Sequence, residues 1–61
     1  MDDISSIKDQ LVNLEADIRS IREALRKAKE AGRDTKLIGS ELAIRLREKE
    51  LLEARLEGYK N

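Results

Sequence analysis

Four glutamates near the C-terminus come closest, in residue type and spacing, to a catalytic or metal-binding cluster. They are Glu48, Glu50, Glu53 and Glu57. Some of them are three or four residues apart, and such pairs share one side of a helix. Paired helical carboxylates hold Mg²⁺ when a second helix supplies further oxygen ligands. The N-terminal half contains no Glu-x-x-Glu counterpart, and Lys49 and Arg55 interrupt the cluster. We therefore interpret it as a solvated, charged helix face.

The chain contains neither His nor Cys. These two residue types are the usual ligands of transition metals, and Cys is also the strongest protein nucleophile and the source of disulfides. A Ser, Thr or Lys nucleophile needs a neighbouring base, and no residue is placed to act as one. The sequence therefore predicts no enzymatic activity, no cofactor and no metal site.

The middle of the chain is basic. Residues 19–36 carry seven basic and three acidic side chains, whereas residues 1–18 carry one basic and five acidic ones. Basic clusters contact phosphate groups, so one interpretation is nucleic-acid binding. Its candidate contacts are Arg22, Arg26, Lys29, Arg33 and Lys36. In the favoured interpretation, these cations stabilise the C-terminal end of a helix and pair with Glu23 and Glu30.

Regularly spaced aliphatic residues indicate one long helix in the first half of the chain. They are Ile4, Ile7, Leu11, Leu14, Ile18, Ile21, Leu25 and Ala28. Their spacing alternates between three and four residues, which is the pattern of the a and d positions of a coiled coil. This pattern predicts an elongated helix that packs along a single partner helix.

The stretch Glu30–Lys36, EAGRDTK, predicts a turn between two helices. Gly32 can adopt the left-handed conformation that ends a helix, and Asp34 or Thr35 can cap the next one. At the N-terminus, Asp2, Asp3, Ser5 and Ser6 offer capping side chains. We predict a first helix over about residues 3–31, a turn at 32–34 and a second helix over about 35–58. A later start at Ser40 is the alternative.

The predicted fold is all-α, a single domain over residues 1–61 that forms a coiled-coil-like antiparallel hairpin of two helices. Antiparallel pairing about the turn sets most of the first-half aliphatics opposite aliphatics of the second half. The exceptions are Arg45, which falls opposite Ile21 unless Leu46 takes its place, and Lys49, which falls opposite Ile18. We expect its stem to lie along apolar surface, and its ammonium group to form a partly buried ion pair with Asp17.

A second line of aliphatic residues predicts a further interface. Leu37, Ile44 and Leu51 recur every seven residues beside the face that packs in the hairpin. Gly39 and Ala43 add a small-residue patch to this predicted protein interface. A chain of this size buries only about 60% of its unfolded surface, and without disulfides or metals oligomerisation is the remaining source of stability. We predict a homodimer that forms a four-helix bundle, with a partner-protein helix as the alternative occupant.

In size and expected shape the chain resembles several families of small helical hairpins. They include the Rop plasmid copy-number regulators, hairpin chaperones of secretion systems, and the short aspartyl-phosphate phosphatases of sporulation phosphorelays. The phosphatases carry a Ser-Gln-Glu-Leu-Asp motif on their second helix. Here the corresponding stretch is GSELAI (residues 39–44), which lacks the Gln and has Ala43 in place of the Asp. The resemblance therefore extends to architecture and carries over no site residue.

The expected function is that of a non-enzymatic interaction module, a small oligomerising adaptor or regulator that acts through exposed helix surface. A Rop-like dimer that binds nucleic acid through the basic turn end is the alternative. The sequence contains no apolar run long enough to span a membrane. Its N-terminus is acidic and polar where a signal peptide is basic and then apolar, so we expect a cytoplasmic protein.

Overall fold

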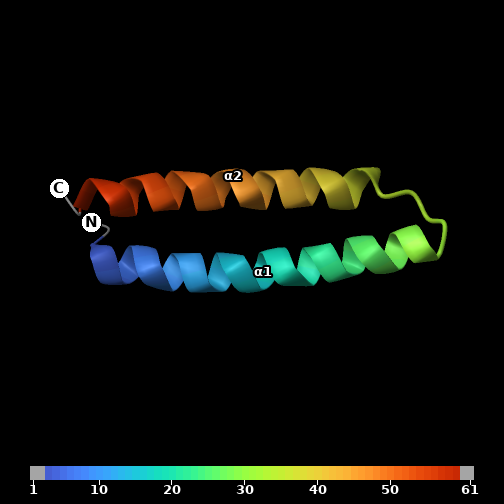
Figure 1. Cartoon of the computed structure of the whole chain (residues 1–61), viewed down its shortest axis with the longest axis horizontal. Helices are drawn as coiled ribbons and strands as arrows, with labels where there is room; N and C mark the ends of the chain where they lie inside the picture. The colour runs from blue at the N-terminus through green and yellow to red at the C-terminus, as the bar shows by residue number, and fades with distance from the viewer. Residues whose placement is uncertain (1–2, 60–61) are drawn as a thin grey trace.

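The computed structural model describes residues 3–59, so Asp2 and the two ends of the predicted domain lie outside the described residues. Helix α1 spans Ile4–Glu30 and helix α2 spans Lys36–Tyr59. The two helices lie side by side and run in opposite directions, with the start of α1 and the end of α2 at one end of the molecule (Figure 1). The hairpin measures 46 × 17 × 15 Å. The predicted antiparallel hairpin is therefore confirmed.

Helix α1 begins with a side-chain cap. Asp3 has an extended backbone, and its Oδ1 atom accepts a hydrogen bond from the Ser6 amide at 2.8 Å. Its carbonyl oxygen accepts the first helical bond, from the Ile7 amide, at 3.0 Å. The first amides of a helix have no partner within the helix, and an aspartate at this position supplies one.

The first helix ends at a glycine, as predicted. Gly32 has a φ of 70°, in the left-handed region that favours glycine. Its amide donates to the Lys29 carbonyl at 3.1 Å, and the Arg33 amide donates to the Ala28 carbonyl at 2.9 Å. These two bonds form a Schellman motif, which satisfies the last carbonyl groups of α1 and turns the chain away from the helix axis.

Helix α2 starts early, before Gly39. The Lys36 amide donates to Oδ1 of Asp34 at 3.0 Å, and the Gly39 amide donates to the Thr35 carbonyl at 2.8 Å. Asp34 thus provides the cap, and the alternative start at Ser40 is wrong. A Cβ atom built on Gly39 would meet no other atom within 4 Å, so the hairpin itself has room for a side chain there.

The apolar core lies along the predicted seam of α1. Its buried residues are Ile7, Leu14, Ile18 and Ala28, all of them members of the alternating aliphatic series. Helix α2 packs against them with side chains that are only half-buried, among them Ile38, Leu42, Leu46, Leu52 and Leu56. No described residue of α2 is fully buried. Two helices alone therefore leave one side of the core open.

Candidate interaction surface

Three large aliphatic side chains of α2 are exposed on one side of the helix. Leu37, Ile44 and Leu51 expose 83%, 51% and 52% of their surface, respectively. They recur every seven residues, close to two helical turns, so they form a line along the helix. We refer to these three residues as the α2 row.

Gly39 and Ala43, the other two predicted interface residues, do not lie on this line. Successive residues are about 100° apart around a helix. Ala43 is therefore about a quarter of a turn from Ile44, and Gly39 lies on nearly the opposite side of α2 from Leu37. The five residues predicted as one interface therefore do not lie on one face of α2. Only the three residues of the α2 row line up along the helix.

The α2 row borders a broad side of the hairpin to which α1 also contributes. The α1 residues on this side recur every seven residues: Gln10, Asp17, Ala24 and Ala31. Gln10 lines a shallow groove together with Leu51, and Ala24 lines a second groove together with Ile38 at the turn end. We call this side of the hairpin the row face.

Charges are unevenly distributed over the row face. Asp17 and Glu48 line one groove in its central part, and Lys27 and Arg33 line the groove at the turn end. Glu48 is paired within α2, because its carboxylate lies 3.2 Å from the Arg45 guanidinium. Among residues 3–59, neither Asp17 nor Lys27 forms an ion pair.

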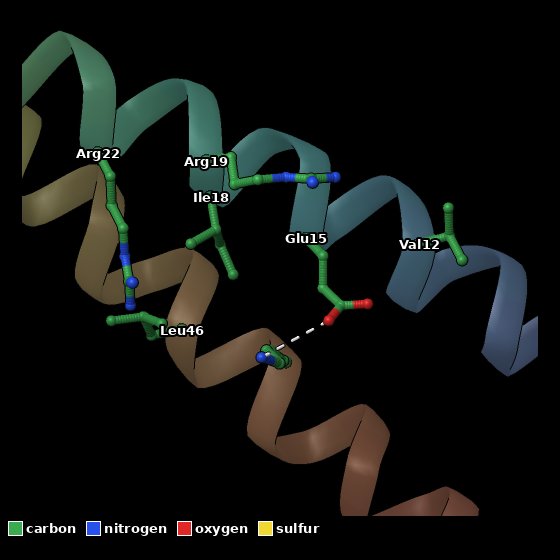
Figure 2. Close-up of a pocket in the computed structure, with 7 residues that line it drawn as sticks. Val12, Glu15, Ile18, Arg19, Arg22 and Leu46 are labelled. Atoms are coloured by element: carbon green, nitrogen blue, oxygen red, sulfur yellow. Dashed lines mark ion pairs between the residues drawn. The ribbon is translucent and has the colours of Figure 1, made fainter.

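The opposite side of the hairpin holds the one ion pair recorded between the helices of the described chain. Glu15 extends from α1 toward α2, and its Oε2 atom lies 3.8 Å from Nζ of Lys49 (Figure 2). The predicted pair of Lys49 with Asp17 is therefore wrong. The stem of Lys49 leaves the seam on the Glu15 side, whereas Asp17 borders the row face. About a third of the Lys49 side chain is exposed, so this pair contributes little to stability.

The five candidate nucleic-acid contacts are dispersed. Arg22 lines the groove shown in Figure 2, and Arg33 lines the turn-end groove of the row face. Arg26 is held by Glu23 and by Glu30, the latter at 2.7 Å, as the pairing interpretation predicted. The hydrogen bond from Arg26 lowers the pKa of the Glu23 carboxyl group below its ordinary value. Lys29 and Lys36 are exposed.

The C-terminal glutamates do not converge. Glu50 lies 3.5 Å from the Arg47 guanidinium, three residues earlier on α2. Across residues 3–59, no group of three or more acidic side chains is close enough to hold a metal ion.

Over residues 3–59, neither helix has the length and hydropathy needed to cross a membrane.

Sequence reasoning missed the ion pairs that link Arg45 and Arg47 to glutamates on their own helix. Each pair joins residues three or four apart, as Arg45 and Glu41 do at 3.7 Å, so the helical spacing contained the signal.

No protein-family model, curated protein sequence or solved structure matches this chain.

Proposed function

We propose that this chain is a non-enzymatic protein–protein interaction module, an oligomerising adaptor or small regulator whose α2 row binds another helix. The observation that supports this proposal is the exposure of Leu37, Ile44 and Leu51 in a single line. Scattered exposed aliphatics are common on protein surfaces, but three large ones in one line along a helix, at a seven-residue spacing, are typical of a face that binds another helix.

The weak burial of α2 gives the same proposal an energetic reason. Full burial of a Leu or Ile side chain stabilises a protein by about 1.5–3 kcal/mol. The isolated hairpin leaves at least half of each row side chain in water. A second helix on this face would therefore add to a core that contains only four buried residues in the described chain. We take a second copy of the chain as the first occupant.

Replacement of the α2 row by glutamine tests this function. We expect Leu37→Gln, Ile44→Gln and Leu51→Gln together to convert an oligomer at micromolar concentration into a monomer of about half its mass or less. Glutamine is nearly as good a helix former as leucine, so α2 itself is retained. Sedimentation velocity measures the mass, and circular dichroism measures the helix content.

The matched control carries three glutamines at the same spacing on another side of α2, at Lys36, Ala43 and Glu50. We expect this variant to sediment like the unaltered chain. Two results contradict the proposal: a monomeric unaltered chain that binds no partner, or equal loss of association in both triple variants.

We propose no nucleic-acid function, because Arg26 is already paired and Arg33 lies on the opposite side from Arg22.

A further inference from the structure

We propose that a second copy packs against the row face with its turn at the opposite end, so that Lys27 of each copy meets Asp17 of the other. This inference rests on the proposed function, because it requires that the α2 row bind a copy of the same chain. It goes further by assigning the orientation, the register and a pair of charged residues that select the partner.

The pairing within one hairpin shows which residues lie at the same level. Leu14 lines a groove with Leu52, and Ala28 lines another with Ile38. Because the helices are antiparallel, moving eight residues toward the turn from Leu14 on α1 and from Leu52 on α2 leads to Arg22 and Ile44, which therefore lie at one level.

This level is also the centre of two separate residue pairs on the row face. Leu37 and Leu51 are equally distant from Ile44 along α2, and Asp17 and Lys27 are equally distant from residue 22 along α1. A two-fold axis at this level, perpendicular to the helices, therefore sets Leu37 against Leu51 of the second copy. The same axis sets Asp17 level with Lys27 of the second copy, without any shift in register.

Small residues occupy the line along which the two α1 helices would meet. The same axis sets Ala24 level with Ser20 of the second copy and Asn13 level with its Ala31. Side chains of this size allow the helices to approach each other closely enough for a lysine to reach a carboxylate. The α2 pair then supplies the apolar contact, and the α1 pair supplies the polar one.

Charge also favours this orientation over the one with both turns at the same end. Residues 1–18 carry a net charge of −4 and residues 19–36 a net charge of +4. Opposite turns bring the acidic half of each α1 beside the basic half of the other. Turns at the same end would bring Lys27 and Arg33 of both copies to one end of the dimer. The groove that these two residues line contains one acidic residue, Asp34, so like charges would accumulate there.

A like-charge contact, which the two-fold axis repeats, opposes the packing, and Arg45 offsets part of it. The axis brings Glu41 close to Glu48 of the second copy. Arg45 of the same hairpin lies 3.7 Å from the Glu41 carboxylate and 3.2 Å from that of Glu48. The two carboxylates thus share one cation, and each copy brings one net negative charge to this contact.

Charge-reversal variants test the Asp17–Lys27 pair. We expect Asp17→Lys and Lys27→Asp each to raise the dimer dissociation constant roughly tenfold, because each places two like-charge contacts in the dimer. An equimolar mixture of the two variants should restore dimers, all of them mixed. Asp9→Lys is the control, since it makes the same charge change at an exposed position on the outer side of α1, and we expect less than a threefold effect.

Single cysteines report the orientation directly, because the chain has no Cys of its own. We expect a short bismaleimide to link the Asn13→Cys chain to the Ala31→Cys chain in a mixture, and to link neither chain to itself. With both turns at the same end, residues 13 and 31 of different copies would be about 27 Å apart along the axis and would not react.

The results separate this inference from the proposed function. A dimer that depends on the α2 row, but in which Asp17→Lys behaves like Asp9→Lys and the two cysteines do not react, overturns the orientation alone. An unaltered chain that remains monomeric overturns this inference, and it overturns the proposed function as well if it binds no partner helix. Selective mixed dimers together with the Asn13–Ala31 link support both.

Discussion

An Ile18→Asp chain will have lost most of its helix content at 25 °C, whereas the unaltered chain is folded. Ile18 lies at the centre of the α1 seam and exposes only 6% of its surface. An unpaired carboxylate at such a site lowers the free energy of unfolding by about 3–5 kcal/mol. A domain of this length has a total of only a few kcal/mol. Circular dichroism and thermal melting provide the measurement.

Ala16→Asp is the matched control for this prediction. Ala16 is on the same helix two residues away, and it is exposed. The substitution introduces the same charge and lowers the free energy of unfolding by less than about 1 kcal/mol, through helix propensity. If the Ile18→Asp chain melts at the same temperature as the Ala16→Asp chain, the seam described above is wrong.

Gly32→Ala will destabilise the hairpin by roughly 1–2 kcal/mol, because alanine in the left-handed conformation is strained by about this amount. The effect comes from the backbone, since a Cβ atom on Gly32 would meet no other atom within 4 Å. Relief of the strain requires a changed turn or an α1 that continues past Glu30. Urea denaturation measures the change in the free energy of unfolding.

Gly39→Ala provides the paired control, with an effect of the opposite sign. Gly39 has the same free space around it but lies inside α2 and has no positive φ. Alanine is preferred to glycine in a helix by about 1 kcal/mol, so this chain should be more stable than the unaltered one. Equal effects of the two substitutions would contradict the turn geometry.

The parts of the fold that depend on local rules were predictable from the sequence. The three-and-four alternation identified the side of α1 that becomes the core, because helical geometry alone puts those side chains in one line. Gly32 and Asp34 marked the turn, since only a glycine suits a positive φ and a short acidic side chain suits a cap. Each of these features involves residues close together in the chain.

The prediction that failed, the pair of Lys49 with Asp17, depends on rotation of one helix against the other. Lys49 and Asp17 lie at about the same level along the hairpin, and for this reason the sequence predicts their pairing. The level of a residue does not determine on which side of the seam a lysine side chain extends. Gly39 and Ala43, the predicted small-residue patch, lie at other angles around α2 than Leu37 and Ile44. Spacing in the sequence gives such an angle only when each step along the helix is converted at about 100° per residue.

The central claim is that the chain turns back at Gly32, so that its two halves pack along one seam and leave the α2 row uncovered. The most direct test is a distance between spin labels at Asp9 and Ala54, both exposed, in labelled chains diluted with unlabelled chains. The hairpin predicts a distance of about 20 Å, set by the spacing of two packed helices and the label arms. A distance near 68 Å, the length of an unbroken helix between these residues, would contradict the account.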